Sequence, residues 1–159
     1  MDIKEIADRI LLKELVDCIS ILGDQKDFQA QVQLFTENAV SETFAGGKVS
    51  LILKGRKEMA EAFVDFLKDV ETIYHFNGQQ VVTINGDKAS GTCYCLITLT
   101  GNEDGKKMRT TIGAIYQDDY VRKDGCWLIA KRTCDLTWQE TVHANSVKVR
   151  LSGRYMLIV

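Results

Sequence analysis

The sequence predicts a single α+β domain in which three N-terminal helices pack on a strongly curved, mostly antiparallel sheet. Apolar side chains recur at helical spacing through most of residues 2–70, whereas long β-rich stretches joined by short Gly, Asn and Asp turns occupy residues 72–138. The chain has 159 residues, of which 45% are hydrophobic. A chain of this size can bury a core without a disulfide or a metal ion, so one domain is expected.

The first two helices are predicted from apolar spacing and from their end signals. Residues 2–22 form the first, because apolar side chains from Ile3 onward recur every three or four positions. Gly23 is a common helix stop and is expected to end it. The second helix is predicted over residues 27–35, with Asp27 as its N-cap.

A hairpin and a third helix are expected next. Residues 40–44 and 49–53 have strand character, and the Gly46-Gly47 pair between them is a turn signal. Gly55 then opens a helix whose apolar positions continue as far as Val70. The N-terminal part of the chain therefore supplies three helices and one short hairpin.

Four long β-rich stretches follow, and the turns between them are typical of hairpins. These stretches are residues 72–84, 88–100, 107–122 and 126–138. Consecutive strands joined by tight turns form an antiparallel meander that twists, and the three helices are available to cover its concave face. We expect residues 1–140 to form one domain around a small-molecule pocket. Residues 141–159 are a C-terminal extension, with 147–151 and 155–159 as short strands or an extended arm and a role as lid or subunit contact.

Composition argues against several classes of partner. The net charge is −2 and the pI about 5.7, which disfavours nucleic acid. No apolar run approaches the length of a membrane span, and the charged N-terminus does not resemble a secretion signal. With an odd number of cysteines, five in all, we expect reduced thiols and a cytoplasmic protein. Cys93 and Cys95 lack zinc-site spacing and are interpreted as small buried residues, and neither a cofactor nor a metal is expected.

Three segments resemble a known family. They are residues 24–28, an acidic bend between the first two helices; His75-Phe76 after the third helix; and residues 119–127 with 135–140 in the last hairpin. From about Leu12 to Glu140 the chain resembles the SnoaL-like group of the nuclear transport factor 2-like superfamily, which includes scytalone dehydratase and the bile acid dehydratases. The resemblance implies a cone-shaped, cystatin-like fold with an internal pocket. Members include enzymes and catalytically silent binders, so the fold alone does not define an activity.

The resemblance implies that Asp24 and His75 form a catalytic pair. In the related enzymes an Asp orients a His that moves a proton next to a carbonyl group and helps a hydroxyl leave. An imidazole suits this task because it titrates near neutrality, and a carboxylate on its far nitrogen fixes the tautomer. Two structural alternatives remain open here. Asp24 follows Gly23 and would serve as a capping residue, and His75 would be a hydrogen-bonded strand histidine.

Several other positions depart from the family pattern and are apolar where the enzymes carry polar groups. The second meander strand places Cys93, Cys95, Ile97 and Leu99 on the face that would carry a second acid or base. Tyr116 is our candidate for holding a substrate oxygen, with a packing role in the core as the alternative. The expected pocket residues are Ile19, Phe35, Thr43, Cys95, Ile97, Thr110, Ala114, Arg132 and Trp138.

Two functions are consistent with these residues. The first is a cofactor-independent dehydratase or isomerase that acts on a small apolar substrate bearing a hydroxyl or keto group. The second is a non-catalytic binder of an apolar small molecule. A homo-oligomer, a dimer or a trimer, is expected with either function, and in the relatives it forms through the outer face of the sheet.

Overall fold

The computed structural model describes residues 2–144, 148–151 and 154–157. The N-terminal elements are the helices α1 (Ile3–Asp24), α2 (Phe28–Val32) and α3 (Gly55–Leu67), with the hairpin β1 (Phe35–Ala45) and β2 (Lys48–Lys54) between the last two. The meander consists of β3 (Val70–Asn85), β4 (Lys88–Glu103), β5 (Lys106–Lys123) and β6 (Cys126–His143). A hairpin of β7 (Lys148–Leu151) and β8 (Arg154–Leu157) follows.

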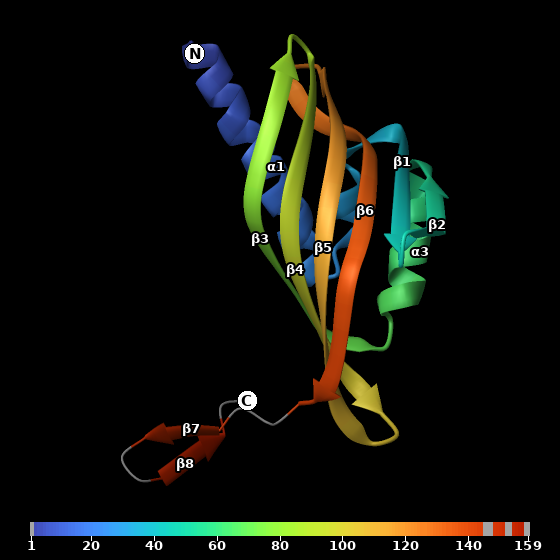
Figure 1. Cartoon of the computed structure of the whole chain (residues 1–159), viewed down its shortest axis with the longest axis vertical. Helices are drawn as coiled ribbons and strands as arrows, with labels where there is room; N and C mark the ends of the chain where they lie inside the picture. Colours follow the sequence, from blue (N-terminus) through green and yellow to red (C-terminus); the bar gives the residue numbers. More distant parts are fainter. Residues whose placement is uncertain (1, 145–147, 152–153, 158–159) are drawn as a thin grey trace.

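Six strands form one sheet in the order β2-β1-β6-β5-β4-β3, and every pair is antiparallel except β1 with β6. The strands are long and twisted, and the helices lie together on one side of them (Figure 1). This arrangement confirms the predicted α+β class with helices packed on a curved, mostly antiparallel sheet.

Strand alternation separates a helix-covered face from an outer face. On β5, Ala114, Tyr116 and Asp118 are buried toward the helices, whereas Gln117 and Asp119 are exposed on the outer face. The core between the layers contains side chains from both, and several of them are completely or almost completely shielded from solvent. These include Leu12, Val16, Val32, Met59, Tyr120 and Ile129.

The first two helices end differently from the prediction. Helix α1 continues through Gly23 and ends at Asp24, with Gln25 as its C-cap. Asp27 caps α2 as expected, its side chain accepting a hydrogen bond from the Ala30 backbone N–H at 3.0 Å. However, α2 is only five residues long, and the predicted helix over 27–35 is wrong at its end. Phe35 instead begins β1, because the chain there pairs with β6.

Two irregularities in β6 decide which of its side chains face the helices. The β5–β6 pairing skips Ala130, so Asp118 lies opposite Arg132, and it skips Thr137, so Trp138 lies opposite Gly113. Each extra residue reverses the alternation of the strand. Arg132 is consequently turned toward the helices, while Trp138 is turned to the outer face and is 50% exposed.

The end of the chain forms the last residues of β6 and a separate two-stranded hairpin. Strand β6 runs to His143, three residues past the expected domain boundary at residue 140, and the β7–β8 hairpin lies within the segment for which short strands or an arm were predicted. In Figure 1 this hairpin lies beyond the end of β6. None of the described helices is long and apolar enough to cross a membrane. All five cysteines are free thiols.

A buried polar cluster fastens the start of α1 to the sheet. Asp8 is only 3% exposed and accepts hydrogen bonds from Arg122 at 2.6 Å and from the Trp127 indole at 3.2 Å. Arg122 also lies over the Trp127 ring and bonds Asp87 in the β3–β4 turn. The hydrogen bond from Arg122, supported by those from Lys4 and Trp127, lowers the pKa of Asp8 from 3.8 to about 2 despite its burial.

We expect Asp8→Asn to lower the free energy of unfolding by about 2 kcal/mol, because it removes charge-assisted hydrogen bonds. The folded-state pKa lies below the unfolded value, so the carboxylate contributes fully above about pH 4 and loses its contribution as the pH falls toward 2. Urea unfolding at pH 7 and pH 3 measures both effects. Asp65→Asn, in an exposed pair with Lys68, is the control and should change stability by less than about 0.5 kcal/mol. Equal effects of the two substitutions would contradict the role of Asp8.

Candidate active site

A cavity of about 170 Å³ lies between the helices and the covered face of the sheet. It is about the size of an engineered cavity that accepts a benzene ring, so its capacity is one small ring. Apolar side chains from both layers form most of its wall, and a few polar groups converge on it. The lining residues are Ile19, Ser20, Gly23, Phe28, Gln31, Phe35, Ser41, Thr43, Phe63, Leu67, His75, Tyr116, Arg132 and Cys134.

Asp24 and His75 meet at one side of this cavity. His75 Nδ1 lies 2.6 Å from Asp24 Oδ1, and the His75 backbone N–H donates to the same carboxylate at 3.1 and 3.2 Å. A carboxylate only accepts at neutral pH, so the proton belongs on Nδ1 and Nε2 is left as the basic nitrogen. The His75 side chain is 17% exposed and lines the cavity. The pair therefore has the tautomer and the shelter that a proton-transfer base requires.

The position of Asp24 favours a role beyond capping. It is the last residue of α1, where the partial negative charge of the helix end disfavours a carboxylate. Its side chain accepts from both the backbone and the ring of His75, on a strand 51 positions away in the sequence. The tertiary contact, rather than a helix cap, therefore accounts for the carboxylate at this position.

Arg132 lies at the same cavity and is held by a buried ion pair. Its Nε and Nη2 each donate to Asp118 at 2.8 Å, and the two residues are 7% and 2% exposed. Burial opposes the charge of Arg132, but the neighbouring Asp118 carboxylate outweighs it and raises the arginine pKa. A guanidinium has five N–H donors, so this pairing leaves donors, including those on Nη1, for an oxygen in the cavity.

Tyr116 and the buried thiols surround this arginine. The guanidinium carbon lies 4.3 Å from the centre of the Tyr116 ring. Burial raises the pKa of Tyr116 well above its usual range and raises that of Cys134 to about 11. Tyr116 therefore stays protonated as a donor, and the Cys134 thiol is not a nucleophile at neutral pH. Among residues 2–144, no group of three or more His, Cys, Asp or Glu side chains is arranged to hold a metal ion.

The end of the Gln31 side chain occupies the space in which a side chain on Gly23 would begin. A Cβ built on Gly23 would lie 2.7 Å from Gln31 Nε2 and 3.8 Å from His75 Cε1. Gln31 Nε2 donates to the Ile19 carbonyl at 2.9 Å, within α1. The glycine therefore allows α2 to place an amide beside the imidazole, and it does not serve as the helix stop that the sequence predicted.

The structure brings together some of the predicted site residues and separates others. Asp24 does not itself line the cavity but contacts His75, which does. The predicted residues that line the cavity are His75, Tyr116, Ile19, Phe35, Thr43 and Arg132. Ser20, Gln31, Ser41 and Asp118 were missed. Ser20, Gly23 and Asp24 fall within about one turn of α1, and Phe28 and Gln31 share one face of α2; these spacings were the available signal.

Five predicted pocket residues lie outside the lining of this cavity. Cys95 and Ala114 are packed into the core, and Ile97 borders that core. Thr110 lies farther along β5 and contacts Thr141 Oγ1 at 2.9 Å. Trp138 is turned outward by the extra residue at Thr137, where it joins Phe76, Tyr94 and Leu96 around a separate hollow of about 310 Å³.

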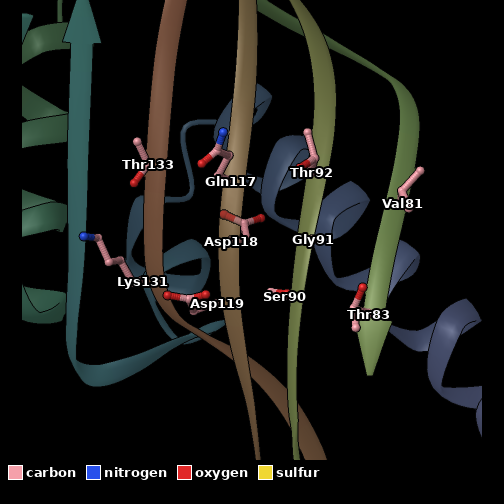
Figure 2. Close-up of a pocket in the computed structure, with 10 residues that line it drawn as sticks. All are labelled: Val81, Thr83, Ser90, Gly91, Thr92, Gln117, Asp118, Asp119, Lys131 and Thr133. Carbon is pink, nitrogen blue, oxygen red and sulfur yellow. The ribbon is translucent and has the colours of Figure 1, made fainter. Parts of the chain in front are cut away.

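A larger and more open hollow, about 470 Å³, lies on the outer face of the sheet. Figure 2 shows its side chains on β3–β6, with the helices beyond the sheet. Hydroxyl and amide groups predominate, such as those of Thr83, Thr92 and Gln117, and Lys131 is paired with Glu42 at 2.9 Å. Its lining includes neither an imidazole nor a thiol. Of these two, the cavity lined by an imidazole is the smaller one under the helices.

The fold and the sheltered cavity define this protein as a helix-covered curved-sheet pocket protein. The model of the SnoaL-like domain matches residues 4–133. The chain belongs to the SnoaL-like family.

A curated relative and several solved structures are similar to this chain. An uncharacterised protein of Mycobacterium tuberculosis is 26% identical over 133 residues, which cover 83% of this chain and 87% of the relative. A candidate scytalone dehydratase from Novosphingobium aromaticivorans superposes with a TM-score of 0.76 at 15% identity, covering 89% of this chain and 91% of that one.

Two further structures share the fold. A type 2 hexachlorocyclohexane dehydrochlorinase, LinA, has a TM-score of 0.73 at 17% identity and covers 97% of this chain and 100% of its own. A protein of Novosphingobium aromaticivorans described as NTF2-like with a cystatin-like fold has a TM-score of 0.66 at 22% identity, with 84% of each chain covered. At these identities the likeness concerns the fold.

We expect Asp118→Asn to lower the free energy of unfolding by about 3 kcal/mol, because it leaves the buried Arg132 charge without its partner. The double variant Asp118→Leu, Arg132→Met should cost less than Asp118→Asn alone, since it removes both charges. Urea unfolding of the three proteins measures these differences. A double variant less stable than the single one would contradict this account of the pair.

Proposed function

We propose that this protein is a cofactor-independent dehydratase or isomerase that acts on a small, apolar ring substrate bearing a hydroxyl or keto group. Proton transfer by His75, oriented by Asp24, is its central step. The observation that carries the proposal is the 2.6 Å contact between His75 Nδ1 and Asp24 beside a cavity of ring size. The chain's cytoplasmic location is part of the same proposal.

In the dehydration, His75 Nε2 accepts a proton from the carbon next to a carbonyl group. The electron pair of that C–H bond forms an enolate, and Arg132 donates a hydrogen bond to its oxygen. The enolate then forms a carbon–carbon double bond and breaks the C–O bond at the next carbon. The imidazolium returns its proton to the departing hydroxyl, which leaves as water. In an isomerisation the same proton returns to a different carbon.

Tyr116 remains the second candidate for holding the substrate oxygen. It lines the cavity, and its pKa is raised by burial, so its hydroxyl can donate at neutral pH. Arg132 is the stronger candidate because a charged donor stabilises an enolate oxygen more than a neutral one does.

The alternative function is non-catalytic binding of an apolar small molecule. Most of the cavity wall is apolar, and the helix-covered face of β4 carries Cys93, Cys95 and Ile97 in place of a second acid or base. The same cavity would then hold its ligand without chemical change, and Asp24 and His75 would act as structural hydrogen-bonding partners.

The first test uses 3-hydroxycyclohexanone, a one-ring β-hydroxy ketone, and follows the formation of cyclohexenone by ultraviolet absorbance. His75→Ala should reduce the rate at least about 100-fold, because it removes the acid and base. Asp24→Asn should also reduce it, because the amide no longer fixes the tautomer. His143→Ala, which alters the other histidine at the exposed end of β6, is the matched control and should keep the rate.

The outcomes separate the two functions. Equal rates in His75→Ala and the unchanged protein, with both folded by circular dichroism, would rule out the proposed chemistry. Binding of cyclohexenone in the cavity without turnover of any hydroxy ketone would support the binder.

We also propose a homodimer formed through the outer face of the sheet, with a trimer as the other expected assembly. Large apolar side chains are exposed there on three strands: Tyr74, Phe76, Tyr94, Leu96 and Trp138, at 41–64%. Monomeric proteins rarely expose contiguous apolar surface of this kind. The β7–β8 hairpin is proposed as a further subunit contact or as a lid.

Light scattering should report a dimer, and Trp138→Lys should convert it into a monomer, because a charge cannot be buried cheaply between two sheets. Phe66→Lys, at a comparably exposed position on α3 (56%), is the control and should leave the mass unchanged. A monomeric parent protein at 100 μM would exclude the assembly.

A further inference from the structure

Two polar side chains of the cavity, Ser20 and Gln31, are not used by the proposed proton transfer. Both line the cavity, and they are 6% and 8% exposed. Polar groups buried to this degree are normally hydrogen-bonded, and leaving one without a partner is costly. The hydrogen bonds that each side chain already makes therefore indicate whether it can still donate a hydrogen bond to a ligand or accept one from it.

Gln31 supplies an acceptor. Its Nε2 donates to the Ile19 carbonyl at 2.9 Å, whereas none of the described residues donates to its buried Oε1. The orientation of the amide is determined by this contact, because a reversed amide would place two oxygens against each other. The group still available for a hydrogen bond is therefore the carbonyl oxygen.

Ser20 supplies a donor beside it. Asn77 Nδ2 donates to Ser20 Oγ at 2.9 Å, so the serine oxygen serves as an acceptor in that contact and its own proton is left for another acceptor. Both residues line the cavity, and Gln31 Nε2 bonds the carbonyl of Ile19, the residue before Ser20 in α1. The helical wall of the cavity therefore carries one donor and one acceptor.

This wall adjoins the imidazole. The position that a Cβ on Gly23 would occupy is 2.7 Å from Gln31 Nε2 and 3.8 Å from His75 Cε1, so both groups border the same space. Arg132 belongs to the opposite layer, on β6. A ligand in the cavity thus meets a charged donor on the sheet side and a donor–acceptor pair on the helical side, with His75 next to the latter.

We propose that Ser20 and Gln31 bind the hydroxyl group of the ligand and determine the specificity of the cavity for alcohols. A hydroxyl group both donates and accepts, so it can donate to Gln31 Oε1 and accept from Ser20 Oγ at once. An ether, a halide or a methyl group cannot donate to Gln31. The inference rests on the proposed function, in which this hydroxyl is the group that leaves next to His75, and it favours dehydration over isomerisation.

The test is the binding of two ring-sized probes, phenol and toluene, measured by NMR titration. They have nearly the same shape, and only phenol carries a hydroxyl. We expect phenol to bind about tenfold more tightly than toluene in the unchanged protein. Ser20→Ala and Gln31→Met should each reduce this preference to threefold or less. Gln31→Met keeps the side-chain volume, and Ser20→Ala is small enough to preserve folding if the former variant does not.

Two controls separate this pair from the rest of the cavity. Ser41→Ala removes a hydroxyl from β1 on the sheet side by the same chemical change and should keep the tenfold preference. His143→Ala, at the exposed end of β6 and outside the lining of the cavity, should keep it as well. A preference that survives both Ser20→Ala and Gln31→Met, or one that disappears in Ser41→Ala, would overturn the proposal.

The two proposals can fail separately. A phenol preference that depends on Ser20 and Gln31, in a protein that dehydrates no hydroxy ketone, would support the hydroxyl site and contradict the enzymatic function. A His75-dependent dehydration with equal binding of phenol and toluene would support the enzyme and reject the hydroxyl site. If neither probe binds at 10 mM, the hydroxyl site is rejected.

Discussion

The contact between Asp24 and His75 joins the helical layer to the meander beside the cavity. The carboxylate accepts from both the backbone N–H and the ring of one residue, so it fixes the position of β3 as well as the tautomer of the imidazole. A carboxylate at the end of α1 is electrostatically unfavourable by itself, and this double acceptance offsets the cost. Moving the end of α1 would therefore disturb both the position of β3 and the tautomer of the His75 imidazole.

Much of the fold could be predicted because periodicity and turn residues are local signals. The three helices, the β1–β2 hairpin and the four meander strands follow from apolar spacing and from turns such as Gly46-Gly47. The errors are at places where distant pairing decides. Residues 33–35 have helical composition, yet the chain there leaves α2 so that Phe35 can join β6. Gly23 has the identity of a stop residue, yet it lies inside α1, where the end of the Gln31 side chain occupies the position of a Cβ.

Only part of the candidate site could be predicted from the sequence, for a similar reason. Asp24 and His75 carry a family resemblance, whereas the facing of Arg132 and Trp138 depends on extra residues in β6 that have no local signature. If β6 paired with β5 without interruption from the turn at residues 123–125, Lys131 would lie opposite Asp118. The side chains of Arg132, Cys134 and Trp138 would then all point to the same face of the sheet. The skipped residue at Ala130 brings Arg132 to Asp118, and the one at Thr137 turns Trp138 outward.

The same bulge gives the cavity its electrostatic character. An unpaired buried arginine would be costly, and it would hold any anion that entered the cavity. Because Asp118 accepts two hydrogen bonds from Arg132, the pair is neutral as a whole while the remaining guanidinium protons are still available. Such a group adds little attraction for a neutral carbonyl but more for the oxygen of an enolate. In the proposed reaction this difference would lower the barrier to proton transfer, since only stabilisation that increases toward the transition state accelerates a reaction.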